Sequence, residues 1–326
     1  MASLRSFGLV GLYLGAQVLA LALALPFRSE GLQTTSNPSS ATAPLYLIGV
    51  IIAAPVVILL IARYRGALNA LRWVILLGIA GSLAITLPTA FAAIFPQWYW
   101  IPASAAGVPF VSPIYPAEIL GVTAAVLLFE ALLLDPQWYI VDFAGLVAGG
   151  ALIALFGISF AILPVFILLI VLACYDAIAV YGTKHMVSLA EVVTDLKLPI
   201  LMVVPSSAGY DYTRNKGFVA QRSRPVEERE AMFMGLGDVV FPGILVVSAY
   251  IWLDPVPMIL GIGANLWVAL GALLGSLAGY ALLMRFVRSG NPQAGLPFLN
   301  GGVLAGFLVT YLLVFHNAGF GLSLQI

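Results

Sequence analysis

Two stretches of this chain each carry a single aspartate in an otherwise apolar run: Leu168-Leu-Ile-Val-Leu-Ala-Cys-Tyr-Asp-Ala-Ile-Ala-Val180 and Met232-Phe-Met-Gly-Leu-Gly-Asp-Val-Val-Phe241. Both runs are hydrophobic enough to cross a lipid bilayer. A carboxylate inside a membrane is costly, so it is rarely present without a function. Because the two aspartates occupy consecutive spans, the sequence predicts that their carboxyl groups meet.

The composition places the chain in a membrane. Of its 326 residues, 62% are hydrophobic and 9% are charged, whereas a soluble domain carries about 25% charged residues. This predicts an all-α polytopic membrane protein. The net charge of zero argues against a nucleic-acid partner. Cys174, His185 and His316 form no cluster with metal-ligand spacing, so we expect neither a metal ion nor an organic cofactor.

Nine apolar segments have the length of membrane-spanning helices. The expected spans are residues 7–26, 44–62, 72–95, 113–134, 138–160, 162–181, 231–253, 257–284 and 297–315. The first is longer than the apolar part of a signal peptide, about 7–15 residues, so we interpret it as a retained span.

The basic residues orient these spans. With a cytoplasmic N-terminus, 13 of the 14 Lys and Arg residues fall in cytoplasmic segments, and only Arg28 falls outside. This asymmetry follows the positive-inside rule. The sequence therefore predicts an integral multi-pass protein with its N-terminus in the cytoplasm and its C-terminus outside.

We expect a single membrane domain over residues 1–326, in three parts. Residues 1–181 hold six spans and the first aspartate, and residues 231–326 hold three spans and the second. The polar segment 182–230 between them is predicted to be a cytoplasmic loop that opens with an amphipathic helix. Within it, the apolar run 199–205 is a candidate strand between two prolines.

The two aspartates are expected at the same depth in the membrane. Asp176 precedes Lys184 by eight residues and Asp238 follows Arg229 by nine, or roughly 12–14 Å at about 1.5 Å per residue. Neighbouring carboxyl groups in a low dielectric share a proton. In an aspartic protease, one carboxylate activates a water molecule while its protonated partner donates to the scissile carbonyl. Either aspartate can take either role.

The residues alone leave two other interpretations open. An intramembrane aspartate pair also serves as a proton or cation relay in coupled transporters, and such a pair can tie two helices together by hydrogen bonds. The other acids near the spans lie close to predicted span ends, where we expect them at the membrane interface: Glu118, Glu130, Asp142 and Asp254. A relay across the membrane needs further acids at the centres of other spans, and the sequence places none there.

The motifs around the two aspartates resemble those of presenilin and signal peptide peptidase. Tyr175-Asp176 is similar to the Tyr-Asp motif of that family, and Gly235-Leu-Gly-Asp238 is similar to its Gly-x-Gly-Asp motif. A third motif, Pro-Ala-Leu, corresponds to Ala294-Gly-Leu-Pro297 at the last span. There Leu296 and Pro297 match, while the first two residues differ.

This resemblance covers the whole chain and implies a presenilin-like fold of nine helices. It implies an intramembrane aspartyl endopeptidase without cofactors, which cleaves transmembrane helices of protein substrates in the bilayer. Asp176 and Asp238 are the implied catalytic residues. Active-site support or substrate binding is expected from Tyr175, Gly235, Leu236, Gly237, Leu296 and Pro297. The short loops are typical of an archaeal-type homologue, which implies the cell membrane of a prokaryote. Homo-oligomerisation stays open.

Three local expectations concern glycine and proline. Gly235 and Gly237 lack side chains, so the seventh span is expected to approach the sixth closely there. Gly271, with the glycines four and eight residues later, predicts a close-packing helix face. Pro297 lacks an N–H, so we expect residues 294–297 to be extended. The resemblance implies that they lie close to the aspartates, and we expect their free backbone groups, or those of the run 199–205, to pair with substrate. The alternative is that Pro297 begins a helix.

Overall fold

The computed structural model of the chain describes residues 2–62, 67–94, 116–183, 201–207, 210–212, 230–287 and 293–321. Within these residues, eight helices are long and apolar enough to cross a membrane, and a ninth, shorter apolar helix lies among them. The polytopic helical fold predicted from the sequence is therefore confirmed. The amphipathic helix expected in the 182–230 segment lies outside the described residues.

The helices follow the predicted spans closely. They are α1 (Ala2–Ser29), α2 (Thr42–Ala62), α3 (Ala67–Ile94), α4 (Pro116–Leu134), α5 (Trp138–Ser159), α6 (Ile162–Ala177), α9 (Leu236–Trp252), α10 (Ala264–Val287) and α11 (Leu296–Phe315). The nearly continuous fifth and sixth spans separate at Phe160 and Ala161, which are extended. The N–H of Ala161 donates to the carbonyl of Pro38, so the break leaves this backbone group satisfied.

The second aspartate stretch departs from its prediction. Residues 231–235, expected to begin the seventh span, form strand β2 (Ala231–Gly235), which pairs antiparallel with β1 (Leu201–Pro205). The predicted strand at 199–205 is thus present over the residues described there. A short apolar run fits either a helix or a strand, and here pairing with β1 satisfies its backbone. The helix therefore starts only at Leu236.

The eighth span also begins later than predicted. A small hairpin of β3 (Met258–Ile259) and β4 (Ile262–Gly263) precedes α10. Leu260 and Gly261 form its turn, both with positive φ, which is the geometry favoured in two-residue hairpin loops. Residues 257–263 are apolar enough for a membrane span, but the hairpin turn prevents them from being helical, so α10 begins only at Ala264.

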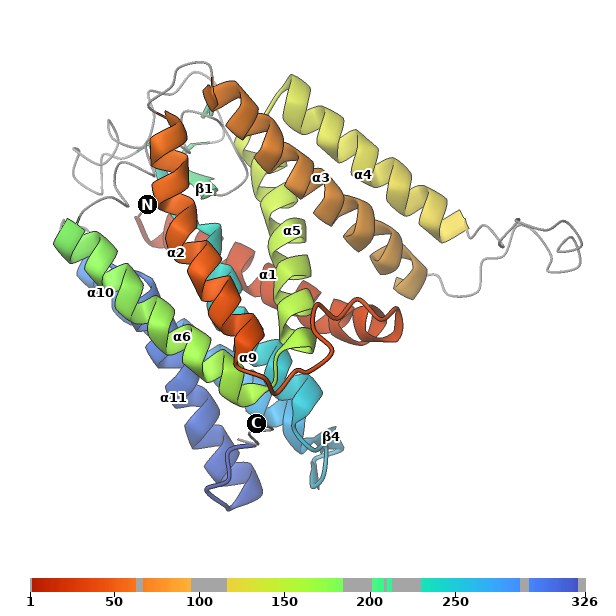
Figure 1. The fold of residues 1–326 in the computed structure, drawn as a ribbon, viewed down its shortest axis with the longest axis vertical. Helices are drawn as coiled ribbons and strands as arrows, with labels where there is room; N and C mark the ends of the chain where they lie inside the picture. Colours follow the sequence, from red (N-terminus) through yellow and green to blue (C-terminus); the bar gives the residue numbers. More distant parts are fainter. Residues whose placement is uncertain are drawn as a thin grey trace, which may run out of the picture.

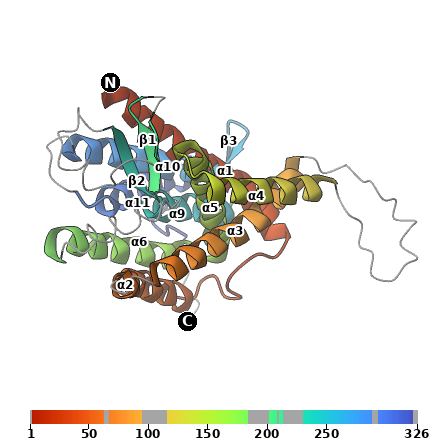
Figure 2. The same ribbon diagram turned by 90° about the horizontal axis from the view of Figure 1, so that it is seen from above.

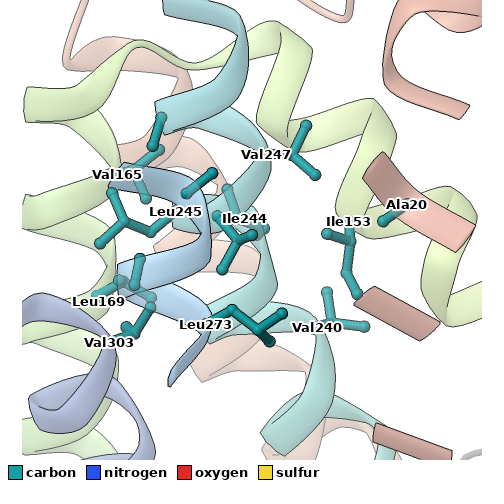
Figure 3. Packing of buried hydrophobic residues seen from close by; sticks show 14 of the residues in the cluster. Ala20, Ile153, Val165, Leu169, Val240, Ile244, Leu245, Val247, Leu273 and Val303 are labelled. Carbon is teal, nitrogen blue, oxygen red and sulfur yellow. The ribbon is translucent and has the colours of Figure 1, made fainter. Parts of the chain in front are cut away.

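Helix α9 lies at the centre of the bundle, in contact with α1, α5, α6, α10 and α11. Figures 1 and 2 show α3 and α4 as a pair beyond α5, on the side away from α10 and α11. The apolar core gathers around α9. In Figure 3, Val240, Ile244, Leu245 and Val247 of α9 lie among labelled side chains of α1, α5, α6, α10 and α11.

Helices α10 and α11 pack with almost no space between their backbones. A Cβ built on Gly275 would collide with the carbonyl of Gly302 and the backbone of Gly306. The close-packing face predicted from the glycine spacing is therefore confirmed. On the outer helices, large apolar side chains such as Val57, Leu77 and Leu127 stay exposed, as expected of groups that face lipid.

Candidate active site

Asp176 lies in the last turn of α6, just before a π-helical turn, η2 (Ile178–Thr183). Its side chain is only 5% exposed. Its Oδ2 accepts a hydrogen bond from the backbone N–H of Leu296 over 3.0 Å, and the backbone N–H of Gly295 also interacts with this carboxyl group. The start of α11 thus holds the first aspartate in place.

Asp238 lies in the first turn of α9, immediately after the sheet. Gly235 is both the last residue of β2 and the N-cap of α9, with an extended backbone. The backbone N–H of Gly235 interacts with the Asp238 carboxyl group, and a Cβ built on Gly235 would lie 3.4 Å from its Oδ2. An acidic side chain in a first helical turn satisfies amide donors that the helix leaves unpaired.

The structure brings the two aspartates together at one end of α11. Their carboxyl groups interact electrostatically, and α6 and α9 are in contact. The same short segment touches both. Leu296 donates its N–H to Asp176, and a Cβ built on Gly295 would lie 3.0 Å from Oδ1 of Asp238. Two carboxyl groups placed this way can act as a general acid and a general base on one bound group.

The predicted extended conformation of residues 294–297 is wrong. Gly295 has helical backbone angles, φ −78° and ψ −45°, and α11 begins at Leu296 with Pro297 in its first turn. Proline fits there because the first helical N–H groups have no partner within the helix. The alternative interpretation, that Pro297 begins a helix, is therefore correct.

Tyr181, which the sequence did not single out, anchors the segment that precedes α11. Its hydroxyl accepts a hydrogen bond from the N–H of Ala294 over 3.2 Å and donates to Oε1 of Gln293 over 2.9 Å. Tyr181 lies in η2, and π-helical turns are frequent at functional sites. No sequence motif marks this contact, because it joins residues more than a hundred positions apart.

The glycines of the Gly-x-Gly-Asp motif do not serve the predicted helix approach. A Cβ built on Gly237 would meet the Phe241 ring at 3.1 Å, and one on Gly235 would meet Asp238. Both contacts are with side chains of α9 rather than α6, because residues three or four positions apart lie on the same side of a helix. Of the other predicted residues, Leu236 packs against Gly149 of α5, and Tyr175 interacts electrostatically with Asp176.

A third carboxyl group is buried near the sheet. Asp142 lies near the start of α5, close to a span end as predicted, and its side chain is only 4% exposed. Its Oδ1 accepts a hydrogen bond from the N–H of Val203 in β1 over 2.7 Å. The strand packs over α5 and covers the carboxyl group. Asp142 therefore fixes β1 to the helical bundle, a contact that sequence position alone could not indicate.

A cavity of about 600 Å³ opens beside this carboxyl group, between α1, α5 and the end of β1. Its wall includes Leu12, Trp138, Asp142 and Ser206, and it does not include either Asp176 or Asp238. Among the described residues, no group of three His, Cys, Asp or Glu side chains is placed to hold a metal ion.

A family model described as signal-peptide peptidase, presenilin aspartyl protease matches residues 10–316. The chain belongs to this family. It is also similar to two solved structures described as a presenilin family intramembrane aspartate protease, in different space groups. One is 29% identical and the other 33%, both with a TM-score of 0.59. The matches cover 93% and 94% of this chain and 95% and 97% of those chains. No curated protein sequence matches the chain.

Family membership decides between the interpretations that the residues left open. The presenilin and signal peptide peptidase family consists of intramembrane aspartyl proteases, so this chain is a multi-pass membrane enzyme of that class. The family supports the implied protease, which acts on transmembrane substrates in the bilayer, and gives no support to a coupled transporter.

Proposed function

We propose that Asp176 and Asp238 form the catalytic pair that hydrolyses a peptide bond in a substrate's transmembrane helix. The observation that carries this proposal is the segment Gly295–Leu296, which touches both carboxyl groups. One carboxylate takes a proton from a water molecule, whose oxygen attacks the scissile carbonyl carbon. The protonated partner donates to the carbonyl oxygen. Transfer of a proton to the amide nitrogen then breaks the C–N bond and releases a carboxyl group and an amine.

The other motif residues take supporting roles in this proposal. Leu296 orients Asp176 through its backbone N–H, and Pro297 starts the helix that presents that N–H. Gly235 orients Asp238 through its backbone N–H. Leu236 and Gly237 form the turn between Gly235 and Asp238. Tyr175 contributes a partly buried ring beside Asp176.

A substrate helix must unwind before its carbonyl is accessible, because helical carbonyls are already hydrogen-bonded. The β1–β2 sheet leads directly into the Gly235–Asp238 motif. We propose that an unwound substrate segment pairs with this sheet. The β1 edge is unsuited to this, because the N–H of Val203 is bonded to Asp142 and Pro205 has no N–H. We therefore expect the substrate on the β2 side.

We also infer the setting of the enzyme. The distribution of basic residues supports a cytoplasmic N-terminus, and the short loops support the cell membrane of a prokaryote. Asp176, Asp238 and the backbone groups that hold them lie in one chain, so the proposed catalytic pair forms within a single copy. Homo-oligomerisation is not required to complete the site.

The test uses the purified protein in liposomes with a generic single-span substrate. Mass spectrometry should find products cut within the span, and a transition-state analogue of aspartic proteases should suppress them. Uptake driven by a pH gradient, measured in the same vesicles without added substrate protein, should be absent. Uptake without cleavage would contradict the proposal in favour of a transporter.

A further inference from the structure

Two polar side chains of α1 are fully buried in the apolar bundle and take no part in the proposed chemistry. Tyr13 and Gln17 are each 0% exposed and lie one helical turn apart. They face α9 and α10, with which α1 is in contact. A polar group inside a membrane bundle is costly unless it forms hydrogen bonds, so what these side chains bind is informative.

Gln17 binds the turn of α9 that follows Asp238. Its Nε2 donates to the carbonyl of Val239, the next residue, over 3.1 Å. A Cβ built on Gly243 would lie 2.7 Å from both the nitrogen and the oxygen of the Gln17 amide. The amide therefore occupies the space that a side chain at position 243 would take, which requires glycine there. It packs against α9 from Val239 to Gly243.

This part of α9 needs an outside contact. Pro242 lies inside the helix and has no N–H, so the carbonyl of Asp238 lacks its usual donor four residues later. The turn that carries Asp238 is thus weakened by one backbone hydrogen bond. The hydrogen bond from Gln17 to the adjacent carbonyl ties that turn to α1.

Tyr13 extends the contact to α10. Its hydroxyl donates to Oγ of Ser276 over 2.8 Å, and Ser276 donates in turn to the carbonyl of Leu273 over 2.7 Å. Tyr13 also lies beside Gln17 and within electrostatic reach of Asp238. Oε1 of Gln17 has no hydrogen-bond partner among the described residues. The amide is thus held through its nitrogen, which donates to Val239 and interacts with the Tyr13 hydroxyl, and by packing.

We propose that Gln17, backed by Tyr13 and Ser276, is a positioning residue of the protease, which fixes the Asp238 turn of α9 relative to Asp176. This inference rests on the proposed catalytic role of Asp238. Helix α1 contacts α9 and α10, whereas Asp176 is held by α11. Loss of the α1 contact lets the two carboxyl groups change their separation.

The experiment compares Gln17→Met, Gly243→Ala and the double variant with the wild type, all purified in detergent and assayed on a single-span substrate. Gln17→Met keeps the length and removes the hydrogen bond, while Gly243→Ala displaces the same amide by its added Cβ. Each should lower kcat about tenfold to a hundredfold and change KM by less than about twofold. The double variant should be no worse than the more damaged single one, because both act on one contact.

Tyr280→Phe is the matched control. Tyr280 lies one turn beyond Ser276 on α10, is buried, and its hydroxyl has no hydrogen-bond partner among the described residues. Its removal should leave kcat unchanged, whereas Tyr13→Phe should lower it. The pH profile is the second readout, because a changed distance between the carboxyl groups changes the separation of the two apparent pKa values of the pair. A purely structural role would lower thermal stability and leave kcat per folded enzyme and the profile unchanged.

Wild-type kcat and an unaltered pH profile in folded Gln17→Met would overturn the inference. If that variant does not fold, Tyr13→Phe, which removes one oxygen atom, decides in the same way. Asp238→Asn is assayed alongside. If Asp238→Asn retains cleavage, the proposed function itself has failed, an outcome distinct from a silent Gln17 variant.

Discussion

Leu296 donates its backbone N–H to Oδ2 of Asp176 over 3.0 Å, although the two residues are 120 positions apart. The contact brings the start of α11 against the end of α6, and it carries Gly295 to the carboxyl group of Asp238. A backbone donor is useful here because every substitution of Leu296 except proline retains it.

Asp176→Asn and Asp238→Asn should each reduce proteolysis by at least about a thousandfold, because an amide can neither accept the water proton nor replace the shared proton. Cleavage is measured on a single-span substrate, with thermal unfolding followed in parallel to confirm folding. Asp254→Asn is the matched control, since Asp254 is exposed and accepts a hydrogen bond from the N–H of Val256. Full activity in either dyad variant would contradict the assignment.

Proteolysis should follow a bell-shaped pH profile. At low pH both carboxyl groups are protonated and no base remains, and at high pH both are ionised and no acid remains. The two apparent pKa values belong to the pair. The measurement is kcat/KM across the pH range in which the protein stays folded. A rate that rises steadily through this whole range would rule out a pair that shares one proton.

Substitution of Gly295 should lower proteolytic activity, and valine should lower it more than alanine. A Cβ at this position lies 3.0 Å from Oδ1 of Asp238, so alanine requires the carboxyl group to shift by a few tenths of an ångström. The family's third motif has alanine here, so Gly295→Ala should retain part of its activity, while Gly295→Val should lose about a hundredfold or more.

Gly301 provides the control for that series. It lies in the same helix, and a Cβ built on it meets no atom within 4 Å. Gly301→Ala and Gly301→Val should therefore cleave at the wild-type rate. Equal loss of activity in the two series would show that α11 tolerates no added side chain, and that the contact with Asp238 is not the cause.

Removal of the Asp142 carboxyl group should loosen β1. Asp142→Ala leaves the N–H of Val203 buried without an acceptor, at a cost of about 1–3 kcal/mol in the free energy of unfolding. Asp142→Asn keeps an acceptor oxygen and should cost less. Thermal unfolding in detergent and limited proteolysis near β1 measure the effect. Equal stability of the Ala variant and the wild type would contradict this role.

The orientation predicted from the basic residues can be tested with single cysteines in a Cys174→Ala background. Ser207→Cys should be labelled by an impermeant reagent only from the cytoplasmic side, and Thr35→Cys only from the opposite side. Ser207 is exposed and Thr35 is partly exposed. The reverse labelling of the two positions would invert the topology and contradict the positive-inside interpretation.

The sequence by itself determined the class of fold and the two central residues. The helical spans could be predicted because the hydrocarbon core requires long apolar segments, and this requirement is local. Asp176 and Asp238 stood out because an acidic residue in such a segment is rare. The glycine spacing on α10 was equally informative, since a helix face is a periodic property of one segment.

Tertiary structure decided what depends on partners distant in the chain. Residues 231–235 form a strand because β1 is beside them, although their apolar run equally fits a helix. Asp142 is buried because β1 covers it, and Gln17 lies against Val239 and Gly243 because α1 packs on α9. The N–H of Leu296 reaches Asp176 only when α6 and α11 meet. Each of these contacts joins residues from separate elements, and the pattern along one element carries no information about which neighbour satisfies its polar groups.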